Sequence, residues 1–175
     1  KHGPLWLVII AALTIVSVGA AWLALNAWSA MYVFLGAFFY AIVYTVWLKR
    51  RTWLNIVFGG LAGSWAVLGG ATAAEPQLGA VPLALAFVLF LWTPPHFWSL
   101  AIACKDDYAA AGVPMLPVVV GNEKAAQTIF YSTIALVAAS FLPLFFGLGW
   151  IYFAGAFIGG ALFLQKSWQL TRDPG

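Results

Sequence analysis

Apolar runs dominate the chain, and short polar breaks divide them into six segments. Each segment holds about 20 mainly apolar residues, the length that an α-helix needs to cross a bilayer core of about 30 Å. The predicted spans are residues 4–25, 28–48, 54–74, 79–104, 125–146 and 150–170. The pattern therefore predicts an all-α, polytopic transmembrane bundle in which sequence neighbours pack antiparallel. Residues 1–175 form a single integral-membrane domain in this interpretation.

The composition excludes an ordinary soluble domain. Of the 175 residues, 64% are hydrophobic and only 7% are charged, whereas soluble domains carry roughly 25% charged residues. The net charge of +3 is too small to indicate a nucleic-acid partner. The single cysteine, Cys104, excludes an internal disulfide. Membrane lipid is thus the expected surrounding, and nucleic acid is not an expected partner.

The basic residues fall on one side of the predicted bundle. With six spans, both ends of the chain and the even-numbered loops share a side, and that side holds every lysine and arginine. The opposite loops contain one acidic residue, Glu75, and no basic one. The positive-inside rule makes the basic side, with both ends of the chain, cytoplasmic. The basic residues are Lys1, Lys49, Arg50, Arg51, Lys105, Lys124, Lys166 and Arg172.

Two prolines in the fourth span mark the first candidate for chemistry. Pro94 and Pro95 lack the N–H that a helix interior uses, so we expect an interruption or kink there. Thr93 and His96 are placed to bond the carbonyls that the prolines free. His96 is the one ionisable side chain well inside the predicted layer. It either caps a freed carbonyl or faces a substrate cavity.

Asp106 and Asp107 follow directly where the fourth span ends, next to Lys105. Ionisable groups at the edge of a hydrocarbon layer are costly and often functional. Carboxylates at a water-accessible mouth suit Mg²⁺, which usually takes one or two of them plus substrate phosphates. The alternative is a solvated helix end. The following loop, residues 108–121, is long enough to lie on the membrane surface or to fold over the mouth.

A basic cluster, Lys49 to Arg51, ends the second span on the same side. It is either a topology signal or, beside the two carboxylates, a site for a diphosphate. Asn55 is placed to join it. In the third span, Gly59 and Gly63 form a GxxxG pair that favours close helix packing.

Three sequence blocks resemble a known family. They are Tyr44-Thr45-x-Trp47-Leu48-Lys49-Arg50-Arg51-Thr52 with Asn55-Ile56-Val57 and Gly59-Gly60; then Trp92-Thr93-Pro94-Pro95-His96-Phe97-Trp98; then Lys105-Asp106-Asp107-Tyr108 with Ala111-Gly112 and Pro114-Met115-Leu116-Pro117. In these blocks the chain resembles the UbiA-type intramembrane prenyltransferases, and among them the protohaem IX farnesyltransferases (haem O synthases).

The resemblance implies a fold, a reaction and a location. The fold would be a bundle of nine transmembrane helices around a central cavity, of which these six spans are similar to helices three to eight. The reaction would be Mg²⁺-dependent farnesyl transfer from farnesyl diphosphate to a vinyl group of protohaem IX, giving haem O for cytochrome oxidase. Haem would be a substrate rather than a cofactor. The implied location is the bacterial cytoplasmic (inner) membrane, and a haem A synthase is an implied partner.

The resemblance also assigns roles to residues of this chain. Asp106 and Asp107 match the second acidic motif, so they would hold Mg²⁺ against the diphosphate, with Asp107 the stronger candidate. His96 matches a histidine that we expect near the haem or the reacting carbons. Together these are the candidate catalytic residues. The candidate substrate-binding residues are Lys49, Arg50, Arg51, Asn55, Trp92, Phe97, Trp98, Lys105 and Tyr108.

One departure from the family pattern leads to a further expectation. The first acidic motif, which follows the second helix in the family, is absent. We therefore expect that the chain lacks two helices at its front and one at its back, and that it does not transfer a prenyl group by itself. Two alternatives remain: a related prenyltransferase that acts on a quinone or chlorophyll precursor, and an inactive fragment, transporter or other non-enzymatic membrane subunit.

Overall fold

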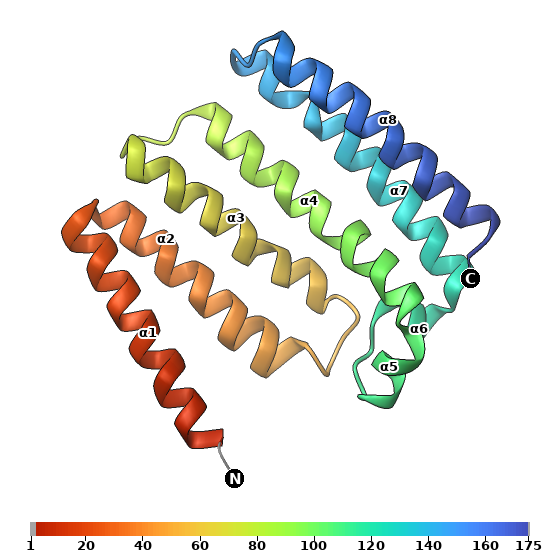
Figure 1. Ribbon diagram of the computed structural model, residues 1–175, viewed down its shortest axis with the longest axis horizontal. Helices are drawn as coiled ribbons and strands as arrows, with labels where there is room; N and C mark the ends of the chain where they lie inside the picture. The colour runs from red at the N-terminus through yellow and green to blue at the C-terminus, as the bar shows by residue number, and fades with distance from the viewer. Residues whose placement is uncertain (1–2, 175) are drawn as a thin grey trace.

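The computed structural model describes residues 3–174, and within that range every regular element is a helix (Figure 1). Six long helical segments cross the molecule, and each begins and ends within three residues of a predicted span. They are α1 (Gly3–Ala24), α2 (Ala27–Phe38) continued by η1 (Phe39–Leu48), α3 (Asn55–Ala74), α4 (Ala80–Ala103), α7 (Asn122–Ser140) continued by η2 (Leu142–Phe146), and α8 (Trp150–Arg172). Two short helices, α5 (Lys105–Ala110) and α6 (Leu116–Val120), lie between α4 and α7.

Five of the six described segments are long and apolar enough to cross a membrane. They are Leu5–Ala24, Ala27–Leu48, Asn55–Ala74, Ala80–Ala103 and Asn122–Phe146. The sixth predicted span forms as α8, but it is less apolar because its last two turns carry Gln165, Lys166, Gln169 and Arg172. The predicted helical bundle is confirmed, and α8 differs from the other five in its polar C-terminal half.

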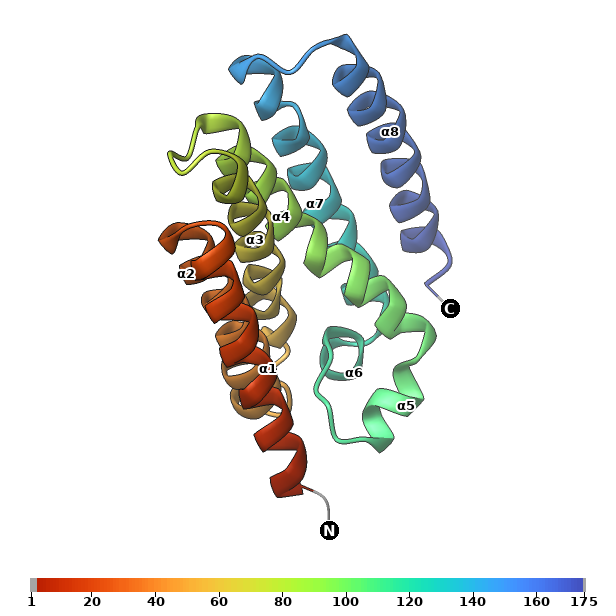
Figure 2. The same cartoon turned by 60° about the vertical axis from the view of Figure 1, so that its left-hand side comes forward.

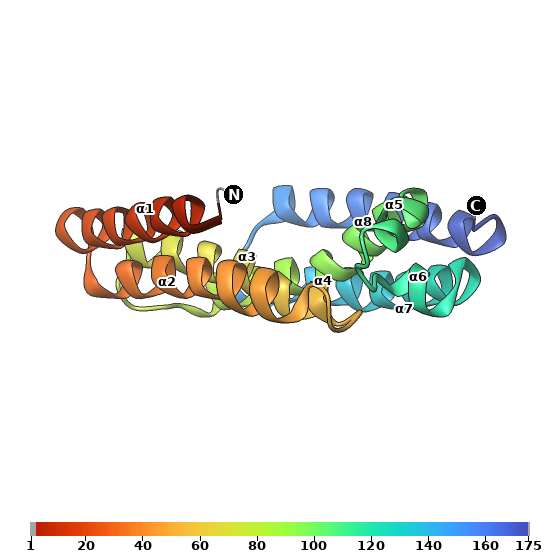
Figure 3. The same ribbon diagram turned by 90° about the horizontal axis from the view of Figure 1, so that it is seen from below.

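The long segments pack in chain order as an open row. Contacts join α1 to α2, α2 to α3, α3 to α4, α4 to α7, and α7 to α8. Seen from below, the two end helices α1 and α8 are raised to the same side of the layer formed by the others (Figure 3). Helices α3 and α4 therefore occupy the middle of the row, also in the turned view (Figure 2).

The second span ends in a π-helix that the apolar pattern did not predict. Over residues Phe39–Leu48 the backbone takes the wider i→i+5 turn, and its last bond joins the Lys49 N–H to the Tyr44 carbonyl at 2.8 Å. The hydroxyl of Thr45 donates to the carbonyl of Tyr40, also five residues back, at 2.7 Å. Short π-helical turns occur often at functional sites. This one leads directly into the basic cluster.

The prolines of α4 do not end the helix. It stays helical from Ala80 to Ala103, and both Pro94 and Pro95 are buried inside it. The Thr93 hydroxyl donates to the carbonyl of Leu89 at 3.0 Å, not to the carbonyls that the prolines free. The ring of His96 makes no hydrogen bond to these carbonyls within the described chain. The predicted interruption was therefore wrong, because α4 runs through the prolines without a break. A kink at this point stays a prediction.

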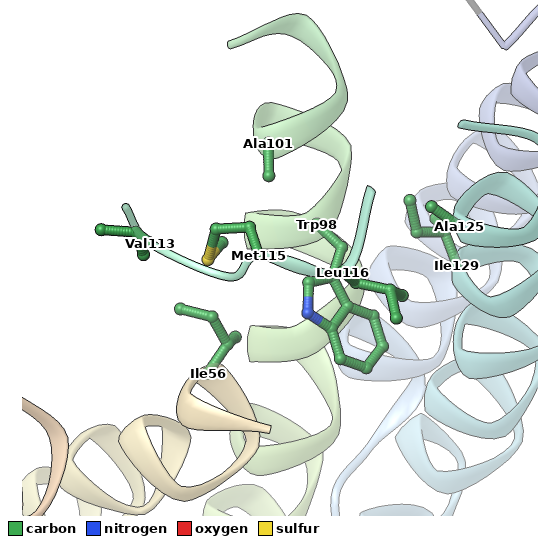
Figure 4. Close-up of a cluster of buried hydrophobic side chains, with 8 residues drawn as sticks. All are labelled: Ile56, Trp98, Ala101, Val113, Met115, Leu116, Ala125 and Ile129. Atoms are coloured by element: carbon green, nitrogen blue, oxygen red, sulfur yellow. The ribbon is translucent and has the colours of Figure 1, made fainter. Parts of the chain in front are cut away.

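The main apolar core lies at the ends of the long helices nearest α5 and α6. It joins Ile56 of α3, Trp98 and Ala101 of α4, Ala125 and Ile129 of α7, and the connecting residues Val113, Met115 and Leu116. Figure 4 shows these side chains pointing toward one another from separate elements. Met115 is 1% exposed. The connection predicted as a surface loop or a cover is thus partly helical and anchored in the core.

Candidate active site

The charged side chains gather at the helix ends on the side of α5 and α6, and we call this end of the bundle the charged end. The loop after η1, the α4–α7 connection and the C-terminus of α8 all lie on this side (Figure 1). The loops at the opposite end, residues 25–26, 75–79 and 147–149, contain Glu75 and no lysine or arginine. Lys1 and His2 lie outside the described residues. The sequence analysis placed the even-numbered loops on one side of the bundle, and the described loops agree with this arrangement.

The basic loop, residues 49–54, connects η1 to α3. The Lys49 ammonium lies 5.9 Å from the centre of the Tyr44 ring, within the range of a cation–π attraction. Arg50 and Arg51 are exposed to the surroundings. The loop thus presents three cations, one of them held against an aromatic ring and two free to meet an anion.

The acidic residues stand in the first turn of α5. Asp106 and Asp107 are exposed, and neither forms an ion pair within the described chain. With Lys105 and Asn122 they line an acidic hollow of about 530 Å³. Adjacent helical positions diverge by about 100°, so the two carboxylates do not face one point symmetrically.

The fit of a divalent metal to these residues is partial. Exposed carboxylates suit Mg²⁺, which accepts one or two protein carboxylates and takes its other ligands from phosphate and water. Among the described residues no group of three or more acidic, histidine or cysteine side chains comes together. Asp106 and Asp107 therefore suit a metal that a bound diphosphate helps to hold, rather than a closed protein cage.

An apolar hollow of about 310 Å³ lies between η1, α3 and α4. Its walls are aromatic: Tyr40 and Tyr44 come from η1, and Trp92 and Phe97 come from α4. Gly59, Gly60 and Gly63 of α3 line it as well. Apolar hollows with a polar rim are typical of small-molecule sites. Tyr44 belongs to both regions, since it lines this hollow and lies under the Lys49 ammonium.

The glycines of α3 let neighbouring side chains of η1 and α4 approach its backbone closely. A Cβ placed on Gly59 would lie 2.9 Å from a Tyr44 ring carbon, and one on Gly60 would lie 3.0 Å from the Thr93 Cβ. Both distances are shorter than ordinary van der Waals contact. A Cβ on Gly63 would lie 3.3 Å from the Leu89 Cδ2. The GxxxG pair of Gly59 and Gly63 therefore serves close packing, as the sequence indicated, and its glycines also line the hollow.

His96 lies on the exposed side of α4 beside this hollow. Its ring stacks on Trp92 with centroids 4.2 Å apart and an angle of 16°, and it meets the edge of Phe97 at 5.1 Å. Because His96 is exposed, its imidazole is open to a ligand on that face of the row. Trp92 carries the contact from His96 to the hollow.

Three other candidates occupy different surroundings. Trp98 is 4% exposed and packs in the core, with Trp53 6.0 Å away. Asn55 is 0% exposed at the start of α3. Tyr108 is half-buried and packs against the same core as Tyr44. Trp92, Phe97, Lys105, Asp106 and Asp107 are therefore the candidates that line a hollow.

The sequence did not single out Tyr44 as a site residue. Its side chain is one of six tyrosines in a chain rich in aromatics, and only the π-helix and the glycines opposite place it at the junction of the two regions. Its place in the first quoted block was the one available signal.

Comparison with known proteins identifies the family. The model of the UbiA prenyltransferase family matches residues 4–175. The chain belongs to this family.

Three relatives show how closely the chain fits within it. It is 61% identical, over 99% of its length, to protoheme IX farnesyltransferase 2 of Paramagnetospirillum magneticum, and covers 60% of that relative. It is 54% identical over 82% of its length to protoheme IX farnesyltransferase 1 of the same organism, covering 51% of it. The Synechocystis protoheme IX farnesyltransferase is 49% identical over 80% of the chain, which covers 45% of it. The chain thus spans about half the length of these relatives. No solved structure matches it significantly.

Proposed function

We propose that this chain is part of an enzyme that transfers a farnesyl group from farnesyl diphosphate to a vinyl group of protohaem IX, giving haem O. The observation that carries the proposal is the junction at Tyr44, where an aromatic hollow meets a basic loop. An isoprenoid diphosphate has the same division, with an apolar chain joined to a dianionic or trianionic head. The names of the relatives at 61% and 54% identity supply the acceptor.

The charged end would hold the diphosphate. Arg50 and Arg51 are exposed donors for phosphate oxygens, and arginine binds them in a bidentate manner. Asp106 and Asp107 would hold Mg²⁺, which supplies stabilisation of the negative charge that builds on a leaving diphosphate. Lys105 borders the acidic hollow beside Asp106 and Asp107 and adds a further cation.

The aromatic hollow would receive the isoprenoid chain. Its rings exclude water, and their faces attract positive charge, so they protect a carbon that becomes electron-poor as its bond to the diphosphate breaks. The farnesyl C1 leaves the diphosphate oxygen and bonds to the terminal vinyl carbon. The inner vinyl carbon then takes a hydroxyl from water, which releases one proton. His96, exposed beside Trp92, is placed to meet the haem.

The orientation in the membrane is part of the proposal. All described lysines and arginines belong to the charged end or to the polar half of α8, and basic loops remain on the cytoplasmic side. We place the charged end in the cytoplasm of a bacterial inner membrane, where farnesyl diphosphate is water-accessible. Haem O would pass to an enzyme that oxidises it further, such as a haem A synthase.

The test is an acceptor assay on the protein as its gene encodes it, in membranes with farnesyl diphosphate. Haem b and a quinone precursor are offered separately, with Mg²⁺ or with excess EDTA. We expect a haem product heavier by one farnesyl group and one hydroxyl group, and its loss with EDTA. Transfer to the quinone precursor alone would contradict haem b as the acceptor. Equal transfer with and without EDTA would contradict the requirement for Mg²⁺.

A further inference from the structure

The side chain of Asn55 has no surface through which it reaches a substrate. It is 0% exposed at the first position of α3. Its amide nitrogen donates to the carbonyl of Thr52 at 2.7 Å and to the carbonyl of Lys49 at 3.3 Å. An amide nitrogen carries two hydrogens, so both are used and none remains for a phosphate oxygen.

The orientation of this amide is fixed by its partners. Rotating it by 180° would turn the Oδ1 atom toward two carbonyl oxygens, with no hydrogen between them. In the observed orientation Oδ1 is buried and finds no donor among the described residues. A buried acceptor without a partner is unfavourable by about 1–3 kcal/mol. The two bonds to the loop therefore persist although the other half of the same side chain is unsatisfied.

The bonds of Asn55 hold the basic loop on either side of its two arginines. Lys49 is its first residue, and Thr52 is three residues before α3. The Thr52 hydroxyl accepts from the Leu54 N–H at 3.2 Å, and the Thr52 carbonyl accepts from the Asn55 N–H at 3.2 Å. Arg50 and Arg51 are enclosed between these anchors and have exposed side chains. The loop backbone also bonds back to the end of η1, with the Arg51 N–H donating to the Leu48 carbonyl at 2.9 Å. The Asn55 amide adds the side-chain bonds that tie the loop to α3.

We propose that Asn55 is a positioning residue for the diphosphate site rather than a ligand of it. It holds the basic loop in the conformation that presents Arg50 and Arg51 together. This inference rests on the proposed function, because it takes the basic loop as the diphosphate site. Without Asn55 the loop would have to be ordered when the substrate binds, and that ordering lowers affinity.

The chain offers a matched control at the opposite end. The Asn26 amide donates to the Thr72 carbonyl at 2.7 Å, and its oxygen accepts from the Ser29 N–H at 2.9 Å. Replacing either asparagine by alanine removes tertiary or loop hydrogen bonds of the same type. Only Asn55 is bonded to the basic loop.

The experiment compares Asn55→Ala with Asn26→Ala in the protein as its gene encodes it. We expect Asn55→Ala to raise the KM for farnesyl diphosphate on the order of tenfold, since small misplacement of binding groups is costly, and to leave the KM for haem unchanged. Asn26→Ala is expected to leave both unchanged. Equal changes in the two variants, or a rise in the KM for haem alone, would overturn the proposal.

Asn55→Ser separates the two bonds. Three serine hydroxyls of this chain donate to the carbonyl three residues back, those of Ser99, Ser140 and Ser167. Serine at position 55 would keep the Thr52 bond and lose the Lys49 bond, so we expect a KM between wild type and alanine. A serine variant worse than alanine would contradict the role of these bonds.

A readout without turnover keeps this inference separate from the proposed function. Hydrogen exchange of the peptide covering residues 49–54 should be faster in Asn55→Ala, and protection by inorganic pyrophosphate with Mg²⁺ should be weaker. Unchanged exchange in the alanine variant would refute the positioning role. Failure of the wild type to farnesylate haem, with these exchange differences intact, would refute only the proposed acceptor chemistry.

Discussion

The loops at the charged end and the loops at the opposite end of the bundle are held by different means. At the opposite end the connections are short, and polar side chains join them: Ser29 and Thr72, both 1% exposed, lie 3.2 Å apart between their hydroxyls. At the charged end the connections are long, and an apolar core of Ile56, Trp98 and Met115 holds them.

The difference follows from what each end exposes. The charged side chains described at the charged end are exposed or half-buried and do not anchor their own loops, because burying a charge is strongly unfavourable. The anchoring therefore falls to neighbouring apolar residues and to one buried amide. The opposite end has no such demand, so local hydrogen bonds suffice there. Three sets of substitutions and one labelling experiment test this comparison.

The largest difference should come from the acidic residues. Asp107→Asn removes a proposed metal ligand, and we expect kcat for farnesyl transfer to fall at least ~100-fold, the scale for losing one charge-stabilising contact. Asp106→Asn should be damaging but milder. Glu75→Gln, at the opposite end, is the control and should retain wild-type turnover. Near-normal kcat in Asp107→Asn, measured at saturating substrate, would disprove the metal assignment.

The core residue Met115 should come next. Met115→Ala leaves a cavity and is expected to lower the free energy of unfolding by about 2–5 kcal/mol. Leu68→Ala removes a buried side chain from α3 nearer the opposite end and should destabilise to a similar degree. Thermal unfolding in detergent gives both values. We expect Met115→Ala to lose more activity than Leu68→Ala at equal stability; equal activity would show that the core does not position α5.

Substitution of glycines in α3 tests whether the aromatic hollow binds the isoprenoid chain. Gly59→Ala places a methyl group against the Tyr44 ring, and overpacking of this type costs about 1–3 kcal/mol. Tyr44 must move, so the KM for farnesyl diphosphate should rise several-fold. Gly70→Ala meets nothing within 4 Å and is the control in the same helix. If both variants bind farnesyl diphosphate equally, the hollow is not the isoprenoid site.

Labelling of Cys104 perturbs the protein least. Cys104 borders the acidic hollow at the charged end, so a membrane-impermeant thiol reagent should label it in inside-out vesicles. Right-side-out vesicles should show little label until they are permeabilised. The reverse result would invert the proposed orientation and place the charged end outside the cytoplasm.

The apolar pattern was sufficient to predict the helices. A span must be about 20 apolar residues long whatever its neighbours are, so segment length and composition set the ends of α1, α3 and α4. The side on which the charges gather follows from helix parity alone. The quoted sequence blocks also indicated the family without the tertiary structure, because each block is a continuous run of residues.

Local rules failed where packing decided the outcome. Pro94 and Pro95 remain inside α4, and the connection after Asp107 folds into the core through Met115. The apolar periodicity did not indicate the π-helix of the second span, in which Tyr44 lies against Gly59 of α3. The chain's ligands and membrane orientation stay predictions.

The sequence by itself determined how many long helical segments there are and which end is charged, and it predicted which residue types would meet a diphosphate. Tertiary structure alone decided that Trp98 belongs to the core, that Tyr44 joins the aromatic hollow to the basic loop, and that Asn55 bonds the loop. Helix formation in an apolar layer depends on each segment's own backbone hydrogen bonds. The site depends on side chains far apart in the chain, and only their packing brings them together.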